Sequence, residues 1–373
     1  MKVILAGDYC PHGRMLRDDR FLDTIAPVIK RNDFAIVNLE CAICPPDSQP
    51  IQKVGPNLRA EARFLDILQS AGFNVLTLAN NHFADYGQEG LHSSLAEISR
   101  SGFYHVGAGK NLNEASWVLY LKDDTCTVAL INACESEFTI ADTDHGGCNP
   151  YNPISLHYAI AEARKHADYV FVIIHGGAED INLPSLRMQQ EYRFLIDSGA
   201  DLVVNHHQHC FLGFEQYKGG YIYYGLGNFC FDWRTEKNAD AAPTPWNYGY
   251  LVEVKIDTTG LHPTVVPYEQ CAREVAVTPL TGEQLARFKS EFSTLSNTLL
   301  DTQALREAYE REVAAHCRDI DRLLLPARLE RYVPRRMAAW WLRHDNHRLR
   351  KLLNAVRCES HRDRLLTYLN TLR

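Results

Sequence analysis

The sequence predicts an α/β fold, a layered sheet covered by helices, with an additional C-terminal helical region. Up to about residue 260, short apolar runs rich in Val, Ile and Leu alternate with amphipathic helical stretches. Each run is too short for a buried helix and ends at a polar cluster, as buried parallel strands do. From about residue 280 the pattern is helical. We therefore expect a body of residues 1–270 and a mainly α-helical appendage of residues 271–373.

The elements of the body follow in order from this pattern. Five buried strands are expected at Val3–Ala6, Ala35–Leu39, Val75–Ala79, Tyr169–Ile174 and Leu202–Val204. Apolar residues recurring every three or four positions, in several cases closed by Gly, predict helices at Ala60–Ser70, Gly90–Ser101, Ser155–His166 and Arg187–Ser198. Three β-rich segments without long helices between them are expected to form antiparallel or mixed strands, namely Val128–Asn132, Tyr221–Tyr224 and Tyr248–Ile256.

Composition excludes several classes of protein. The chain has 373 residues, of which 46% are hydrophobic and 23% charged, which is typical of a globular protein rather than a disordered one. No apolar run approaches the roughly 18 residues of a membrane span. Only five apolar residues precede Asp8, so the N-terminus does not resemble a secretory signal, and we expect a cytoplasmic protein. A net charge of −7 argues against a dedicated nucleic-acid binder.

The helical region differs from the body in charge. Residues 301–373 carry +6 and the first 300 residues carry −13. Two stretches, Leu323–Leu325 and Ala338–Leu342, are too apolar to be solvated on every side. We expect this region to pack either on the acidic body or against a second copy of the chain, as a homodimer contact. Because it carries no metal-ligand motif, we expect it to be dispensable for metal binding.

Polar residues follow five successive strands, at the point where each strand ends. In order they are Asp8, Glu40, the amides and histidine of 80–82, His175, and the histidines of 206–209. In an open α/β sheet the carboxyl ends of the strands meet at the ligand-binding edge, so these side chains should converge. Imidazole together with carboxylate favours Mn, Zn or Fe.

Two adjacent ions fit this set of residue types. His207 and His209 are two residues apart, so an extended strand end would point both the same way, toward neighbouring ions. A carboxylate between them would form the natural bridge. Two ions about 3.5–4 Å apart clamp the attacking and leaving oxygens of an in-line displacement and lower the pKa of a bridging water. The residues therefore predict a divalent transition-metal centre, with two ions.

The motifs also resemble a known family. They are Gly7-Asp8, Asn38-Leu39-Glu40, Leu78-Ala79-Asn80-Asn81-His82 with Asp85-x-Gly87, His175-Gly176-Gly177-x-Glu179, Gly199-Ala200-Asp201-Leu202-Val203, His206-His207-x-His209 and Tyr224-Gly225-Leu226-Gly227-Asn228-Phe229. In this order, over residues 1 to about 260, they resemble the CapA family of bacterial capsule and poly-γ-glutamate synthesis. That family is similar to the calcineurin-like metallophosphoesterases, which implies an α/β/β/α sandwich.

The resemblance implies a role for each ligand. Asp8 and His209 match ligands of the first metal, and Asn81, His175 and His207 match ligands of the second. Glu40 occupies the position of the bridging carboxylate and belongs with His82 to the catalytic residues. His82 matches the histidine that acts near the leaving group.

The chain departs from the superfamily pattern at two positions. Cys10 stands two residues after the first Asp, where a His is usual, and Glu40 is one methylene longer than the usual Asp. Three readings follow for the first metal: Cys10 binds as a thiolate, His12 replaces the missing ligand, or the first metal is weak and the isolated protein is mononuclear.

Substrate contacts are expected from the loop after the bridging carboxylate. The segment Cys41–Ala60 contains four prolines and could bring Lys53, Asn57 or Arg59 over the site, where a cation would bind an anionic group. His206 is a further candidate for substrate binding. Asn228 follows a Gly-Leu-Gly turn and either lines the rim or is buried structure.

Three functions compete at this point. The first is hydrolysis of a phosphomonoester or diester, on a nucleotide, sugar phosphate or glycan-linked substrate, by hydroxide bound to the metal with His82 protonating the leaving oxygen. The second is cleavage of an amide in an anionic γ-glutamyl polymer by the same hydroxide. The third is a non-catalytic accessory role in capsule polymer synthesis. All three imply an anionic small-molecule or polymer ligand.

Overall fold

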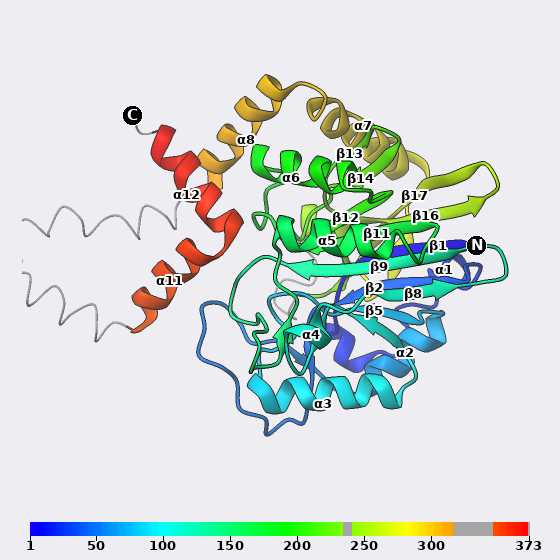
Figure 1. Ribbon diagram of the computed structural model, residues 1–373, viewed down its shortest axis with the longest axis vertical. Coiled ribbons are helices and arrows are strands. Elements are labelled where there is room, and N and C mark those ends of the chain that lie inside the picture. The colour runs from blue at the N-terminus through cyan, green and yellow to red at the C-terminus, as the bar shows by residue number, and fades with distance from the viewer. Residues whose placement is uncertain (234–240, 317–345, 372–373) are drawn as a thin grey trace, which may run out of the picture.

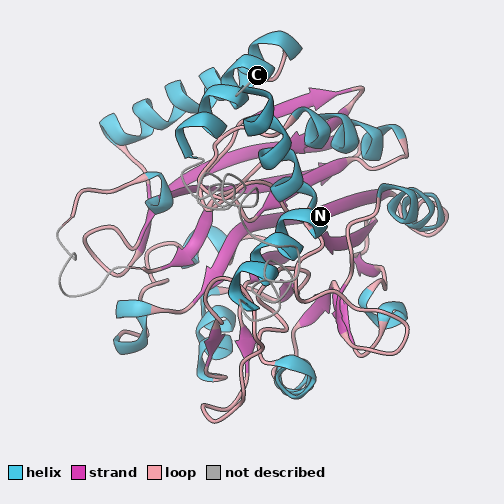
Figure 2. Ribbon diagram, turned by 90° about the vertical axis from the view of Figure 1, so that its left-hand side faces the viewer, coloured by secondary structure: helices cyan, strands magenta, loops and turns pink. Residues whose placement is uncertain are grey.

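A computed structural model describes residues 1–233, 241–316 and 346–371. Its centre is two mixed β-sheets packed face to face, with helices on both outer sides (Figures 1 and 2). Side chains of both sheets, such as Val3 and Leu5 from one and Val172 and Val204 from the other, share one buried cluster. The expected fold class, an α/β layered sandwich followed by C-terminal helices, is confirmed.

The first sheet has the strand order β18-β17-β16-β1-β2-β5-β6, with β15 also paired to β1. Its strands are β1 (Lys2–Cys10), β2 (Phe34–Leu39), β5 (Val75–Thr77), β6 (Tyr104–Val106), β15 (Asn228–Phe231), β16 (Tyr248–Asp257), β17 (Gly260–Gln270) and β18 (Val277–Pro279). The strands β1, β2, β5 and β6 are parallel, whereas β16 runs antiparallel to β1. The carboxyl ends of β1, β2 and β5 therefore lie at one edge.

The second sheet has the order β13-β14-β12-β11-β9-β8. Its strands are β8 (Leu119–Lys122), β9 (Thr127–Cys134), β11 (Tyr169–His175), β12 (Leu202–His206), β13 (Phe214–Tyr217) and β14 (Gly220–Tyr223). The inner strands are parallel, and the outer pairs β8·β9 and β13·β14 are antiparallel. Two short ladders complete the β structure, β3 (Ala42–Ile43) with β4 (Arg59–Ala60) and β7 (Ala108–Gly109) with β10 (Gly147–Cys148).

The helices of the body form because each carries one apolar face. In α3 (Gly87–Arg100), Leu91, Leu95 and Ile98 recur at helical spacing and are buried. The other body helices are α1 (Ala26–Ile29), α2 (Arg63–Ala71), α4 (Leu112–Ala115), α5 (Pro153–Ala163) and α6 (Leu186–Asp197). Helix α2 ends at Gly72, whose left-handed φ of 106° closes the last turn. All four helices expected between the strands are present, within a few residues of the expected ends.

The C-terminal region is helical where it is described, as expected. Its helices are α7 (Gly282–Thr298), α8 (Thr302–His316), α11 (Asn346–Arg357) and α12 (Glu359–Thr371). Phe288, Leu295, Leu305 and Val313 of α7 and α8 join the buried cluster of the second sheet. The apolar stretches 323–325 and 338–342 lie outside the described residues. Among the helices that are described, none is long and apolar enough to cross a membrane.

Gly7 shows how the sequence positions the site. A Cβ at Gly7 would lie 1.8 Å from the carbonyl oxygen of Gly227, so only glycine allows the two segments to approach this closely. The backbone N–H of Asp8 donates to that same carbonyl oxygen, at 3.3 Å. The close approach therefore sets Asp8 and Asn228 opposite each other in the register of β1 and β15.

Candidate metal centre

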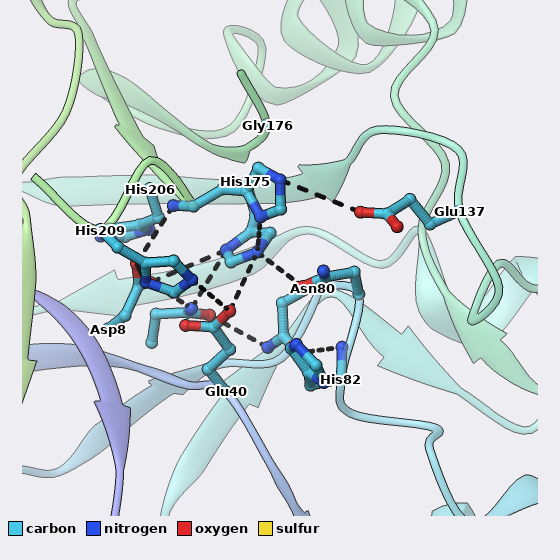
Figure 3. Close-up of polar contacts among 12 residues, drawn as sticks. Asp8, Glu40, Asn80, His82, Glu137, His175, Gly176, His206 and His209 are labelled. Atoms are coloured by element: carbon cyan, nitrogen blue, oxygen red, sulfur yellow. Dashed lines mark hydrogen bonds and ion pairs between the residues drawn. The ribbon is translucent and has the colours of Figure 1, made fainter. Parts of the chain in front are cut away.

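Histidines and carboxylates from both sheets converge at the carboxyl ends of the central strands (Figure 3). Two groups of three residues offer ligand atoms within 4.8 Å of one another, Glu40 with His175 and His207, and Asp8 with Glu40 and His209. Glu40 belongs to both groups. All five side chains are buried, between 0% and 6% exposed. The arrangement offers two adjacent groups of candidate ligands that share one carboxylate.

The distances around Glu40 and Asp8 are those of side chains gathered about a common centre. Oε1 of Glu40 lies 3.5 Å from Nε2 of His175 and 3.9 Å from Nε2 of His209. Oδ2 of Asp8 lies 3.9 Å from Nδ1 of His209. A divalent metal binds such nitrogens and oxygens at about 2.0–2.2 Å, so a centre between them needs only small side-chain movements.

His207 and His209 reach the centre through a turn, which corrects the expectation of an extended strand end. Strand β12 ends at His206, and the φ angles of His207 and His209 are +91° and +56°. The backbone N–H of His207 donates to Oδ2 of Asp8 at 3.1 Å. In the His207 ring, Nδ1 lies 3.0 Å from Nε2 of His175. The left-handed turn therefore aims both rings at the same centre, at a backbone cost that functional sites commonly carry.

Three amides orient the ligands. Oδ1 of Asn81 lies 3.0 Å from Nε2 of His175, which places it beside the second group as expected. Asn38 was not expected as a site residue; its Nδ2 donates to Oδ1 of Asp8 at 2.7 Å and lies 3.3 Å from Nδ1 of His175. Asn80 in turn donates to Oδ1 of Asn38 at 3.2 Å. Both residues stand within the motifs noted above; Asn38 contacts two candidate ligands, and Asn80 holds Asn38.

The electrostatics of Glu40 are those of a group that could bind a cation. Both of its carboxylate oxygens are buried, and no described residue donates a hydrogen bond to either. Burial, and then the neighbouring carboxylates of Asp8 and Glu179, raise the pKa of Glu40 well above its ordinary value. A buried carboxylate without donors is costly unless a cation balances it. The residues present therefore fit a divalent metal, and Glu40 is the residue that needs it most.

His175 is suited to bind a metal as a neutral ligand. Burial, followed by the nearby rings of His207, His206 and His209, lowers the pKa of His175 well below its ordinary value. A neutral imidazole keeps the lone pair that a metal requires. Around His175, Nδ1 faces Asn38 and Nε2 faces Asn81 and His207. The ring is thus held in one orientation at the middle of the cluster.

Lys53, His82 and Asp85 form a second polar group beside the metal ligands. Nδ1 of His82 lies 2.7 Å from Oδ2 of Asp85 and 3.0 Å from Nζ of Lys53, and Lys53 also forms an ion pair with Asp85. The Lys53 side chain is only 2% exposed. Burial and the charge of Lys53 lower the pKa of His82, against the opposing effect of Asp85. Lys53 does reach the site, and it does so through His82.

Cys10 and His12, the two candidates for the missing first-metal ligand, lie elsewhere. Cys10 belongs to the hydrophobic cluster of the first sheet, where burial and its hydrogen bond with the Cys41 thiol raise its pKa well above the ordinary value. The His12 ring packs on Trp233 at 4.8 Å, with Nδ1 3.3 Å from the Asp232 carbonyl oxygen. Neither belongs to the described residues gathered around Glu40.

The other substrate-binding candidates have mainly structural contacts. Asn57 donates to the carbonyl oxygens of Ile51 and Asp85, at 3.2 and 3.0 Å, and so ties its loop to the site. Arg59 interacts with Tyr86. His206 is buried with Nε2 3.1 Å from the Ala6 carbonyl oxygen.

Asn228 is buried, and its place resolves the alternatives left open for it. Its Oδ1 lies 2.9 Å from Nδ1 of His209, and its Nδ2 lies 3.3 Å from the carbonyl oxygen of the same residue. Asn228 therefore orients a ligand from inside the site rather than lining the rim.

A cavity of about 440 Å³ adjoins the centre. Lys53, Asn81 and His82 line it from the body, and Lys351, His361 and Arg364 line it from α11 and α12. Nothing in the sequence indicated this wall, because the helical region carries no ligand motif. The expectation that this region is dispensable for metal binding stays a prediction, but its helices form one wall of the cavity beside the candidate centre.

Known proteins resemble this chain in sequence. Over 226 residues it is 32% identical to the capsule biosynthesis protein CapA of Bacillus anthracis, a match that covers 58% of this chain and 55% of that protein. Over 286 residues it is 29% identical to the PGA biosynthesis protein CapA of Bacillus subtilis, covering 74% of this chain and 75% of that protein. The matched region thus spans about half the length of the Bacillus anthracis relative.

Solved structures and a family model complete the comparison. A phosphatase from Mycoplasma pneumoniae aligns with a TM-score of 0.46 at 14% identity, covering 72% of this chain and 92% of that chain. A putative 5'-nucleotidase from Staphylococcus aureus aligns with the same score and identity, covering 79% and 58%. Residues 2–233 match the model of the family described as bacterial capsule synthesis protein PGA_cap. The match covers more than half of the chain, which therefore belongs to the bacterial capsule synthesis protein PGA_cap family.

Proposed function

We propose that this protein is a metal-dependent hydrolase that cleaves a phosphoester. The observation that carries the proposal is Glu40, whose two buried oxygens lack described hydrogen-bond donors and which belongs to both groups of candidate ligands. In the proposal, Asp8, Glu40 and His209 hold one ion, and Glu40, Asn81, His175 and His207 hold a second. Divalent ions bound there supply Lewis acidity and activate water near neutral pH.

The chain's own residues supply the proton chemistry. Asp85 accepts from Nδ1 of His82, which leaves Nε2 as the atom that exchanges a proton with the leaving oxygen. Lys53 pairs with Asp85 and lies 3.0 Å from Nδ1 of His82, so it tunes the basicity of the ring as well as holding it. Since Lys53 lowers the pKa of His82, a bound phosphate dianion would raise it again by the opposite effect.

A second candidate function keeps the centre and changes the bond. The Bacillus subtilis relative is named a PGA biosynthesis protein and matches 74% of this chain, which supports a γ-glutamyl polymer as ligand. Cleavage of its amide would use the same ligands, and His82 would protonate the leaving nitrogen. A non-catalytic accessory role in polymer synthesis would instead use the centre to bind polymer without turnover.

Metal analysis and a substrate screen separate these functions. We expect the protein purified without chelator to carry one or two equivalents of Mn, Zn or Fe, and to hydrolyse chromogenic phosphomonoesters or diesters in the presence of Mn²⁺. A γ-linked glutamate oligomer is assayed in parallel for release of glutamate. Metal with glutamate release alone favours the second function. Absence of metal after loading and dialysis contradicts both.

A further inference from the structure

The helices α11 and α12 lie beside the carboxyl ends of the strands, although α11 begins only at Asn346, well after the end of the body (Figure 1). Together with the loop that carries Lys53 they enclose the cavity of about 440 Å³ next to the metal centre. Cavities that bind small ligands have volumes of about 300–1,000 Å³. The volume is therefore sufficient for a substrate longer than the group bound at the metals.

An ion-pair network fixes α12 to the body. Oε1 of Glu135, just after β9, accepts from Nη2 of Arg187 at 2.7 Å and from Oγ of Ser360 at 2.9 Å. Nε of Arg187 also donates to Oδ2 of Asp363 at 2.6 Å. The backbone N–H of Ser136 donates to Glu359 at 2.9 Å. Because these partners are buried or half-buried, the start of α12 has a defined position on the carboxyl edge of the second sheet.

A second set of contacts joins the helices to the metal centre itself. Nδ2 of Asn354 donates to Oε2 of Glu137 at 3.1 Å and lies 3.2 Å from Nδ1 of His361. The other oxygen of Glu137 lies 3.9 Å from Nε2 of His207, a candidate ligand (Figure 3). Glu137 thus lies between the centre and the helices, and it also lines the cavity.

Charged side chains line the cavity on both the body side and the helix side. Lys351 and Arg364 are contributed by α11 and α12, and Lys53 by the body. Two carboxylates also line the cavity: Glu137, which accepts a hydrogen bond from Asn354 of α11, and Glu179. The helices therefore place two cations on the wall of a cavity that Asn81 and His82 line from the side of the candidate metal centre.

We infer that α11 and α12 complete the substrate pocket, and that Lys351 and Arg364 bind a second acidic group of the substrate, remote from the group at the metals. Guanidinium and ammonium groups bind carboxylate or phosphate in this way. The substrate class is an elongated molecule with an anionic group at each end, or a polyanion. The inference rests on the proposed function for the group bound at the centre.

Matched pairs of non-hydrolysable ligands test the inference by calorimetric titration of the Mn-loaded protein. Alkylphosphonates are compared with ω-phosphonoalkanoates of two to six methylenes, which differ only in the distal carboxylate. Alkanoates and the corresponding dicarboxylates form a second series, which distinguishes a phosphate from a carboxylate at the centre. We expect one chain length of an acid-bearing ligand to bind about tenfold more tightly than its partner, as two charge-assisted contacts allow.

The variants assign that preference to the helices. In Lys351→Ala/Arg364→Ala we expect the preference for the acid-bearing ligand over its partner to fall below about twofold. The control Arg357→Ala/Arg362→Ala removes two cations from the same helices, outside the cavity lining, and should retain the affinity preference of the wild type. The single variant Lys351→Ala, at an exposed position, covers the case in which the double variant does not fold. Metal content and thermal unfolding are measured for each.

The outcomes separate this inference from the proposed function. Phosphonate binding that depends on metal but gains nothing from the distal acid, or a preference that survives in both Lys351 variants, overturns the inference and leaves phosphoester hydrolysis in place. Binding confined to the dicarboxylate series, with a preference lost in the Lys351 variants, supports the inference and contradicts the phosphoester substrate. Failure of every ligand to bind overturns both.

Discussion

Glu40 and Glu135 are both buried carboxylates at the carboxyl ends of strands, and their surroundings are opposite. No described residue donates a hydrogen bond to Glu40, and its nearest polar neighbours are histidines and Asp8. Glu135 accepts from Arg187, Ser360 and the backbone of Gly177. Burial would raise the pKa of Glu135, but Arg187 and these hydrogen bonds lower it, whereas the pKa of Glu40 is raised.

The difference distinguishes Glu40, which belongs to a candidate cation site, from Glu135, which belongs to an ion-pair network whose positive charge the protein itself provides. Around Glu135 the protein supplies the positive charge itself, through Arg187. Around Glu40 the neighbouring side chains are of types that bind metals, His175 and His209, and they carry no fixed positive charge. The group of Glu137, Cys358 and His361 also has ligand atoms close together, but Asn354 contacts Glu137 and His361 there. Ligand-type residues in proximity are thus a weaker sign of a metal than buried oxygens left without donors.

Removing the Glu40 charge should have the largest effect. We expect Glu40→Gln to lose nearly all bound metal and all hydrolytic activity, because both ligand groups share this carboxylate. In the metal-free state the same variant should unfold at a temperature equal to or above that of the wild type, since it removes an unbalanced buried charge. Metal analysis and thermal unfolding after chelation measure the two effects.

Glu215→Gln is the matched control for that prediction. Glu215 is buried but accepts from Arg193 at 2.7 Å and from the Tyr224 hydroxyl at 3.0 Å. Its replacement should lower stability and leave the metal content unchanged. If Glu40→Gln retains metal, the shared-carboxylate arrangement is wrong.

His82→Ala should lower turnover about 10²–10⁴-fold while the metal content stays near that of the wild type. The reason is that His82 contacts Asp85 and Lys53 and belongs to neither ligand group. Steady-state rates and metal analysis of the same preparation test both parts. His157→Ala, a half-buried histidine on α5, serves as control. Loss of metal in His82→Ala would make His82 a ligand and contradict its assignment as proton donor.

Arg187→Met should destabilise the protein by about 3 kcal/mol, because it leaves the carboxylates of Glu135 and Asp363 without their cation. Chemical denaturation gives the change in the free energy of unfolding, and limited proteolysis reports on α11 and α12. The double variant Arg187→Met/Glu135→Gln should recover part of the loss. Equal destabilisation in single and double variants would show that the pairing contributes little.

Low pH should weaken the attachment of α12 to the body, by a smaller amount than the Arg187→Met substitution does. Glu135 has a lowered pKa in the folded protein, so its contribution to stability is present above its unfolded pKa, about 4.3, and is lost as the pH falls through the folded value. Hydrogen exchange in residues 359–371 should therefore rise below about pH 5. In Glu135→Gln this part of the pH dependence should disappear. An unchanged exchange profile between wild type and variant would exclude Glu135 as its origin.

Most of the centre was predictable because strand ends are local features. The five strands and the polar residues that follow them are visible in the sequence, and parallel strands bring their carboxyl ends to one edge. This places Asp8, Glu40, Asn81, His175, His207 and His209 together, as the structure does. The backbone conformation expected for His207 and His209 was wrong, because nothing in their spacing distinguishes an extended segment from a left-handed turn.

The sequence by itself determined the α/β class, the helical C-terminal region and the candidate ligands, since each depends on periodicity or on position at a strand end. Only the tertiary structure decided that Lys53 contacts His82, that Cys10 and His12 lie away from Glu40, and that α11 and α12 form a wall of the cavity. These contacts join segments far apart in the chain, 225 residues for Glu135 and Ser360. No local pattern fixes such a distance, because it depends on how complete layers pack.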